Sequence, residues 1–425
     1  MRRIAILIPN YSVCKSLTTL NTAALLAEEG YEVEVITNVS LEGCSPIKGV
    51  KMYSRSSNNL TQEDTVREKK RTPMGKVAWW TESRLGWVPG MHRLITKARG
   101  LWGRSLLLFI RWAFSICRDK DYTCLIGSDP PGLIAATILG WRFRAPVAYH
   151  SLELYLWRDS ISLTGKWQKA LEAWCNRRCV FTIIQDQDRA RCLIRENHID
   201  RSQIVIMPVA GLGDPSRKKT SFLRRKLKIP DDKVIILQVG GVFHFNMCLE
   251  LAQAAQDFPD SWVLVLHGFP YSEPYVQSIL TIAPKGKVVL SLQKIPLEQM
   301  DDLVASADIG VALYRNLGPN FYYTGSASNK LVDYLKHGLP VIVSDFPSLR
   351  QVIERYQCGI CIDDPSQLTT AIQRVLGNYH SFSQRAIACY RERYDARLYI
   401  GEVLERIEEL ENSSSEKCAA SHGRF

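Results

Sequence analysis

Residues 325–345 read Gly-Ser-Ala-Ser-Asn-Lys-Leu-Val-Asp-Tyr-Leu-Lys-His-Gly-Leu-Pro-Val-Ile-Val-Ser-Asp. This stretch predicts a loop of small residues, a helix that begins near Ser328, and a buried strand that follows Pro340. Ser326 or Ser328 can cap the start of the helix, and Gly338 with a proline soon after it is typical of a helix end. The stretch is therefore one helix–strand step of an α/β fold.

The start of this helix predicts an anion site. Free backbone N–H groups at Ser328 and Asn329, the positive end of the helix dipole and the ammonium of Lys330 converge there. Asp333 lies three residues after Lys330, so both side chains face about the same side of the helix. A cation for phosphate beside a carboxylate for ribose hydroxyls suits a nucleotide. An ordinary, well-capped helix explains the same helix signals without a ligand.

Strand and helix patterns alternate along most of the chain, which predicts two doubly wound, parallel α/β domains. Turn formers and charges at 211–219 suggest a linker, so we expect an N-terminal domain at 1–209 and a C-terminal domain at 210–394. A helix at 395–411 and a Ser-rich, disordered tail at 412–425 follow. Open α/β sheets bind ligands at the carboxyl ends of their strands, which predicts a ligand cleft between the two domains.

The net charge of +11 is unevenly distributed. Residues 67–118 contain twelve Lys or Arg against two Glu, together with five of the ten tryptophans. We assign a basic, Trp-rich insertion to about residues 55–118. Cations with interleaved Trp favour an anionic membrane surface. A plain solvated insertion and nucleic-acid binding remain alternatives, but no recognised nucleic-acid motif accompanies these charges.

No apolar run approaches the roughly 18 residues of a membrane span. Residues 1–9 are too short for a signal-peptide core and are typical of a first strand. The twelve cysteines are scattered and predict no disulfide framework. We therefore expect a cytoplasmic protein, peripheral at the inner face of the membrane.

The pattern Asn-Lys-Leu-x-Asp-Tyr-Leu-x-x-Gly-x-Pro-Val-Ile at 329–342 resembles the nucleotide-sugar site of the GT-B glycosyltransferases, and most of all the retaining family 4 group. The resemblance implies the two facing Rossmann-like domains of the GT-B fold. It also implies that the N-terminal domain receives the acceptor, that the C-terminal domain binds the nucleotide, and that the helix at 395–411 crosses back to the N-terminal domain.

The resemblance also assigns roles to single residues. Asp333 takes the place of the second carboxylate of the family's Glu-x7-Glu motif, which binds the ribose. The first carboxylate of that motif falls on Gly325, where only backbone N–H groups of residues 324–327 are available instead. Gly240 and Gly241 follow a strand and allow close approach of a phosphate or sugar. The basic pair that often follows them in the family is missing, and His244 or Asn246 stands nearby.

His150 and Glu153 resemble the family's His-x-x-Glu segment at the floor of the cleft. We expect His150 to contact donor or acceptor and Glu153 to orient it or to hold an acceptor hydroxyl; a structural histidine is the alternative. Lys330 completes the predicted catalytic set, because an ammonium offsets charge on a leaving diphosphate. Asp186-x-Asp188 is interpreted as a helix cap, so no metal and no cofactor are expected.

The resemblance implies a retaining, hexosyltransferase-type glycosyltransferase. It would move a sugar from a nucleotide sugar to a hydroxyl of a lipid-linked or saccharide acceptor in surface polysaccharide or glycoconjugate assembly. Two alternatives remain open: a non-catalytic relative or partner subunit, favoured by Gly325 and the missing basic pair, and a nucleotide-sugar epimerase. The nucleotide base, the sugar, the acceptor and the oligomeric state cannot be read from the residues.

Overall fold

The computed structural model describes residues 2–10, 16–55 and 104–422. The described residues form two compact units. The N-terminal unit comprises those within Met1–Ile184, Arg191–Val205 and Glu402–Phe425, and the C-terminal unit comprises Gln185–Ala190 and Ile206–Gly401. Most of the predicted basic insertion, with Trp79, Trp80, Trp87 and Trp102, lies outside the described residues.

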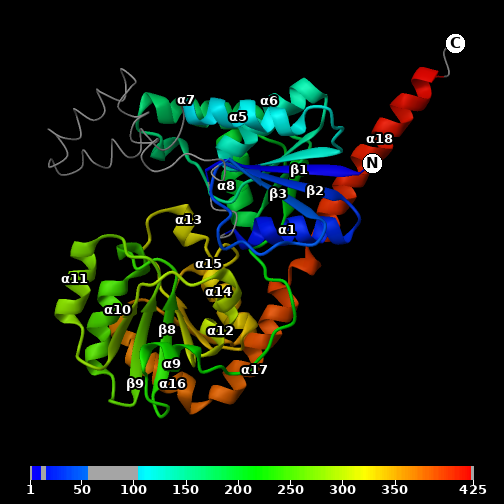
Figure 1. The fold of residues 1–425 in the computed structure, drawn as a ribbon. Coiled ribbons are helices and arrows are strands. Elements are labelled where there is room, and N and C mark those ends of the chain that lie inside the picture. The colour runs from blue at the N-terminus through cyan, green and yellow to red at the C-terminus, as the bar shows by residue number, and fades with distance from the viewer. Residues whose placement is uncertain (1, 11–15, 56–103, 423–425) are drawn as a thin grey trace. The chain divides into compact units, whose positions relative to one another are not determined.

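The N-terminal unit contains a seven-stranded sheet of order β3-β2-β1-β4-β5-β6-β7 (Figure 1). Its strands are β1 (Arg3–Ile8), β2 (Glu32–Thr37), β3 (Val50–Ser54), β4 (Cys124–Ser128), β5 (Val147–His150), β6 (Thr182–Ile184) and β7 (Ile204–Ile206). The strand pairs of known register are parallel. Its helices are α1 (Leu17–Glu28), α5 (Arg104–Cys117), α6 (Asp129–Phe143), α7 (Leu163–Asn176), most of α8 (Gln187–Asn197) and most of α18 (Ile400–His422).

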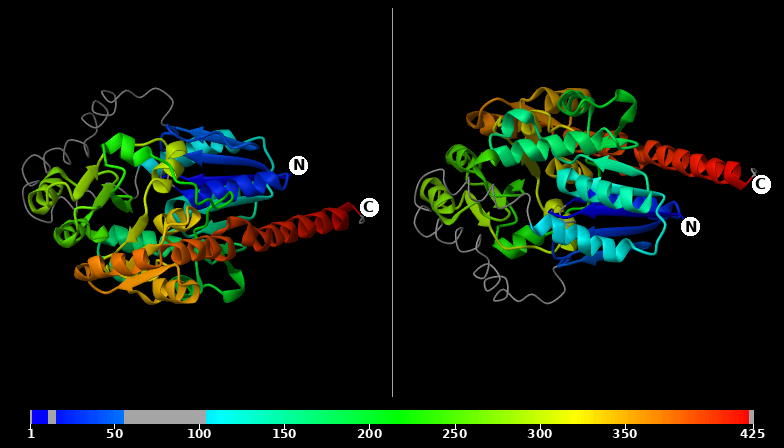
Figure 2. Two further views of the ribbon diagram at one scale, coloured as in Figure 1. Left: turned by 90° about the horizontal axis from the view of Figure 1, so that it is seen from below. Right: turned by 90° about the horizontal axis from the view of Figure 1, so that it is seen from above.

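The C-terminal unit contains a six-stranded sheet of order β10-β9-β8-β11-β12-β13, also parallel. Its strands are β8 (Val234–Val239), β9 (Trp262–His267), β10 (Val288–Ser291), β11 (Ile309–Ala312), β12 (Val341–Ser344) and β13 (Gly359–Ile362). Its helices are α9 (Phe222–Leu227), α10 (Cys248–Ala254), α11 (Glu273–Ile282), α12 (Met300–Ala305), α13 (Pro319–Tyr322), α14 (Asn329–Lys336), α15 (Pro347–Tyr356), α16 (Leu368–Gly377) and α17 (Tyr379–Cys389). Figure 2 shows the same elements from two further sides.

Two hydrophobic cores lie on the two faces of the C-terminal sheet, because successive side chains of a strand point to opposite faces. Ile235, Leu237 and Val239 of β8 pack into one core, and Ile236 packs into the other. The first core also takes the apolar side of α14, whereas the second takes α10 and α16. A strand buried on both faces is apolar along its whole length, which is why continuous apolar runs in the sequence predicted this sheet.

The chain departs from its predicted segmentation in three places. The first unit gives way to the second after Val205, and residues 211–219 belong to the C-terminal unit, where Gly211 bridges Asp395. The last helix begins at Ile400 rather than near residue 395, and it continues to His422 through residues predicted as a disordered tail. Its described end lies in the N-terminal unit, where Arg2 Nη2 pairs with Glu411 Oε2 at 2.5 Å.

Nine cysteines of the described residues are free thiols, and Cys44 is disulfide-bonded. No helix among the described residues combines the length and the apolar character needed to cross a bilayer.

Candidate nucleotide site and its partner residues

The loop after β8 is shaped by close contacts between backbones. Gly240 has φ +115° and Gly268, after β9, has φ +144°. A Cβ atom on Gly268 would lie 1.3 Å from the carbonyl oxygen of Gly240, and one on Gly241 would lie 2.0 Å from the ring of Phe243. Glycine is therefore required at 268 by the chain itself, whereas a side chain at 241 would have to displace the ring of Phe243. Gly240 is exposed, and a Cβ placed on it would lie 3.8 Å from Cε of Lys330.

The start of α14 is capped as the sequence predicts. Ser328 is the N-cap, and its Oγ accepts a hydrogen bond from Leu331 N at 3.3 Å. The same hydroxyl lies 2.6 Å from the hydroxyl of Tyr314, which follows β11. Within the described residues no hydrogen bond engages the backbone N–H groups of Asn329 and Lys330. These two donors, at the positive end of the helix, are available to an anion.

Lys330 brings its ammonium to the loop after β8. Nζ donates to Oδ1 of the buried Asn246 at 3.0 Å and lies 4.7 Å above the centre of the Tyr314 ring. Asn246 is itself fixed, because its Nδ2 donates to Gly241 O at 2.7 Å. Burial lowers the pKa of Lys330 to about 8. No carboxylate of the described residues forms an ion pair with this ammonium, so a partly desolvated cation is held without a counter-ion from those residues.

Asp333 lies one turn further along α14, but its charged neighbours are different. The pKa of Asp333 is raised to about 7, mainly by burial and further by the carboxylate of Asp301, against the opposing effect of Lys336. Lys336 Nζ pairs with Asp301 Oδ2 at 3.0 Å. The side chain of Asp333 therefore lies among charged groups on the α12 side of α14. The ammonium of Lys330 lies beside the loop after β8 instead.

Close packing explains why residue 325 is a glycine, and the sequence alone does not reveal this. A Cβ atom there would lie 2.3 Å from the carbonyl oxygen of Ser348. The N–H of Gly325 donates to Ser348 Oγ at 3.1 Å, and its carbonyl accepts from the hydroxyl of Tyr394 at 2.5 Å. The N–H of Ala327 is bonded to Thr324 O. Two of the four N–H groups expected to replace a missing carboxylate are thus used within the chain.

A cavity of about 250 Å³ opens at the carboxyl ends of β11, β12 and β13. Its lining includes Tyr314, Ser344, Asp345 and Asp363. Sequence reasoning missed the two carboxylates, although each directly follows a buried strand. The cavity adjoins the lysine site through Tyr314, whose ring lies under the Lys330 ammonium.

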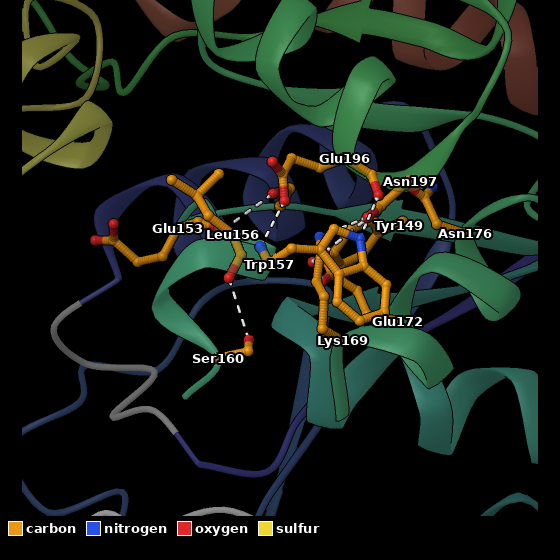
Figure 3. A network of polar contacts seen from close by, with 11 residues as sticks. Tyr149, Glu153, Leu156, Trp157, Ser160, Lys169, Glu172, Asn176, Glu196 and Asn197 are labelled. Atoms are coloured by element: carbon orange, nitrogen blue, oxygen red, sulfur yellow. Dashed lines mark hydrogen bonds and ion pairs between the residues drawn. The ribbon is translucent and has the colours of Figure 1, made fainter. Parts of the chain in front are cut away.

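In the N-terminal unit, His150 ends β5 and is buried. Its Nε2 has no hydrogen-bond partner within the described residues, and burial lowers its pKa to about 4. The imidazole is therefore neutral near pH 7 and offers a hydrogen bond rather than a charge. Glu153 is exposed and points away from the buried polar network beside it (Figure 3).

The segment from His150 to Glu153 is held by Asp129, a residue whose role sequence reasoning missed. Asp129 Oδ1 accepts from Leu152 N at 3.0 Å and from Glu153 N at 3.1 Å. The residue is buried with φ +54°, and burial followed by the charge of Glu153 raises its pKa to about 7. The signal available in the sequence was an aspartate before two prolines, directly after the strand end at Ser128.

The Asp186-x-Asp188 segment forms a helix cap, as predicted. Asp186 Oδ1 accepts from Arg189 N at 2.8 Å. No cluster of metal-binding side chains occurs among the residues that the structure describes.

Comparison with known proteins identifies the family. Residues 16–210 match the glycosyl transferase 4-like domain, and residues 234–378 match the domain described as glycosyl transferases group 1. The chain belongs to the group 1 glycosyltransferases. The two matches cover one doubly wound unit each, which confirms the predicted resemblance and the GT-B fold class. No curated protein matches the glycosyltransferase by sequence.

Solved structures share the fold of this glycosyltransferase at low sequence identity. HepE of Anabaena, determined with UDP and glucose, is 13% identical with a TM-score of 0.65 and covers 96% of this chain and 100% of its own. Sucrose-phosphate synthase of Thermosynechococcus elongatus is 14% identical with a TM-score of 0.65, covering 99% and 100%. WaaG, a glycosyltransferase involved in lipopolysaccharide biosynthesis, is 13% identical with a TM-score of 0.58, covering 95% and 98%.

Proposed function

We propose that this glycosyltransferase uses a nucleoside diphosphate sugar as donor and transfers the sugar to a hydroxyl acceptor. The observation that carries the proposal is the ammonium of Lys330, partly buried without a carboxylate partner from the described residues beside two free N–H groups of α14. A diphosphate would supply the missing negative charge and accept those hydrogen bonds. HepE, which shares the fold, has been determined with UDP-glucose.

The chemistry follows from this placement of charge. The acceptor hydroxyl forms a bond to the anomeric carbon while the bond from that carbon to the diphosphate oxygen breaks. Lys330 and the N–H groups of Asn329 and Lys330 stabilise the negative charge that develops on the leaving diphosphate. Because peptide groups and an ammonium supply the positive charge, the proposal includes no metal ion. We assign the ribose hydroxyls to Asp333, and sugar or acceptor hydroxyls to His150 and Glu153.

Retention of configuration, with the leaving phosphate taking the proton of the acceptor hydroxyl, is part of the same proposal and follows from the family resemblance. We further propose a lipid-linked acceptor in surface polysaccharide or glycoconjugate assembly. The shared fold of WaaG, which is involved in lipopolysaccharide biosynthesis, supports this choice.

One observation favours a second candidate, a non-catalytic relative that keeps the fold. Gly325 stands where the family has a carboxylate, and the carbonyl of Ser348 leaves no room for a side chain there. This candidate lacks that carboxylate, and it would bind the nucleotide without transferring a sugar.

The first test is the shift in melting temperature caused by UDP or GDP, with Lys330→Ala as the variant and Lys285→Ala, an exposed lysine of the same unit, as the control. We expect one nucleotide to bind and Lys330→Ala to weaken it by about thirty- to a hundredfold, as for loss of a charge-assisted hydrogen bond. An unchanged shift in Lys330→Ala would refute the site.

The second test is transfer of radiolabelled sugar from a panel of nucleotide sugars to membrane extract, with EDTA present and absent. Transfer by the wild-type chain supports the enzyme. Nucleotide binding without transfer supports the non-catalytic relative, and transfer abolished by EDTA contradicts the metal-free proposal.

A further inference from the structure

The solvent-facing side of α7 is apolar. Leu163, Trp167 and Leu171 lie four residues apart, and Trp174 lies three residues after Leu171, so all four share one face of the helix. Their exposed fractions are 78%, 70%, 41% and 45% in chain order. A surface helix of a globular protein normally turns such a stripe toward the core.

The opposite side of α7 is polar and buried. Lys169 Nζ donates to Glu172 Oε2 at 2.9 Å and to Asn197 Oδ1 at 2.5 Å, and Tyr149 OH donates to Glu172 Oε1 at 3.1 Å (Figure 3). Asn197 Nδ2 donates to Asn176 Oδ1 at 2.9 Å. This network fixes the rotation of α7 about its axis, since turning the stripe inward would expose or break a buried ion pair. The outward apolar stripe is therefore a property of the folded unit.

Neighbouring elements extend the apolar surface. Ile161, directly before α7, is 86% exposed, and Trp141 of α6, the helix packed beside α7, is 85% exposed. Single exposed apolar side chains are normal, but a group with several tryptophans indicates a binding surface. We call Trp141, Ile161 and the α7 stripe the α7 face.

The segment of chain that carries the α7 face has exposed charges of one predominant sign. Within residues 137–180 the exposed acidic side chains are Glu153 and Asp159, whereas six basic side chains are exposed: Arg142, Arg144, Arg158, Lys166, Arg177 and Arg178. The guanidinium of Arg178 lies 3.8 Å from the centre of the Trp174 ring. Aromatic rings beside cations suit the headgroup level of a bilayer, where tryptophan partitions and basic side chains contact phosphate.

We propose that the α7 face docks on the surface of an anionic lipid bilayer. The apolar stripe enters the boundary between headgroups and acyl chains, and the surrounding cations contact anionic headgroups. A second copy of the chain fits less well, because a two-fold interface would oppose this basic surface with itself. The purpose of docking, access to a lipid-linked acceptor, rests on the proposed function, while the docking itself does not.

The test is co-sedimentation of the full chain with phosphatidylcholine vesicles and with vesicles of equal parts phosphatidylcholine and phosphatidylglycerol. We expect binding to the anionic vesicles, weakened by salt. Leu163→Ser with Trp167→Ser should weaken it about tenfold or more, and Lys166→Gln with Arg177→Gln severalfold. Trp167→Phe should stay within about threefold of wild type, because it keeps a large apolar ring.

Leu280→Ser is the matched control, because Leu280 is a 52% exposed leucine on a helix of the C-terminal unit. It should leave vesicle binding unchanged. An unchanged melting temperature and an unchanged UDP-induced shift show that each variant is folded, and they keep this test separate from that of the donor site. If the Leu163→Ser, Trp167→Ser variant binds vesicles as tightly as wild type does, the proposal is overturned. The membrane-binding residues then lie elsewhere in the chain, with residues 56–103 among the candidates. If the wild-type chain is a dimer that does not bind vesicles, and this variant is a monomer, the α7 face binds a second copy of the chain instead of a membrane.

Discussion

Helices α7 and α14 are both amphipathic, but they are oriented in opposite ways. α14 buries Leu331, Tyr334 and Leu335 against its sheet and keeps Asn329 exposed. α7 buries Lys169 and Glu172 and exposes its leucines and tryptophans. The comparison shows that periodicity predicts two faces of a helix, whereas the neighbouring elements decide which face is buried.

The neighbours of the two helices explain the difference. Tyr149, Thr182 and Asn197 present polar groups beneath α7, and Asn176 of α7 donates from Nδ2 to Thr182 Oγ1 at 2.6 Å. Beneath α14, the apolar strands β8, β11 and β12 offer only backbone polar groups. A buried ion pair seldom adds stability over an apolar pair of similar size, but removing one partner is costly. The network under α7 therefore specifies orientation.

Breaking the inner face of α7 should have the largest effect. Glu172→Ala leaves the ammonium of Lys169 buried without its carboxylate, so we expect a loss of about 3–5 kcal/mol in the free energy of unfolding. Chemical denaturation measures it. Replacing both partners, Lys169→Met with Glu172→Leu, should recover most of the loss. If Glu172→Ala costs less than about 1 kcal/mol, the ion pair does not hold α7.

The inner face of α14 should be less sensitive. The hydroxyl of Tyr334 accepts from Val239 N at 2.8 Å and donates to Leu237 O at 2.9 Å, while Gly310 leaves room for the ring. Tyr334→Phe leaves a buried N–H unpaired, so we expect a loss of about 1–3 kcal/mol in the free energy of unfolding.

Tyr379→Phe is the control for this substitution, because its hydroxyl donates only to the carbonyl of Asp308 and no N–H loses a partner. We expect a cost of about 1 kcal/mol or less from chemical denaturation. Equal costs for the two tyrosines would show that the unpaired N–H of Val239 is not the reason for the loss.

Nucleotide binding at the start of α14 should respond to pH. Burial lowers the pKa of Lys330 to about 8, so above that pH the free protein loses the proton that a bound diphosphate needs. UDP affinity should therefore be steady between about pH 7 and 8 and then fall by up to about tenfold per pH unit. Calorimetric titration measures it. Lys330→Arg, which stays charged, should remove the decline above pH 8; a decline that persists would assign the titration to another group.

The sequence predicted α14 and the two sheets well, because each rests on local signals. Ser328 caps the helix, Gly338 ends it, and apolar runs such as Val341–Ser344 form strands buried on both faces. The approach of Lys330 to Gly240 also follows from chain order, since helix starts and strand ends meet at one edge of a parallel sheet. The roles of Asp333, His150 and Glu153 stay predictions.

Tertiary contacts decided what the sequence left open. The carbonyl of Ser348 next to Gly325, the partner Asn246 of Lys330 and the contact of Asp129 with the N–H of Leu152 all join residues far apart in the chain. The apolar face of α7 was missed for the same reason, because Trp167 at helical spacing is typical of a core residue. We assigned membrane contact to residues 55–118, most of which lie outside the described residues, whereas the exposed tryptophans that the structure describes lie on α6 and α7 and just before α7.

The outer face of α7 should be the least sensitive to substitution. The side chain of Trp167 lies on the solvent-facing side of α7 and is 70% exposed, so little of its apolar area is buried on folding. We therefore expect Trp167→Ser to change the free energy of unfolding by no more than about 0.5 kcal/mol, in contrast to Glu172→Ala one turn further along. Chemical denaturation of the two variants side by side measures the contrast. If Trp167→Ser costs about as much as Glu172→Ala, the tryptophan is buried in solution, and the inverted orientation of α7 is wrong.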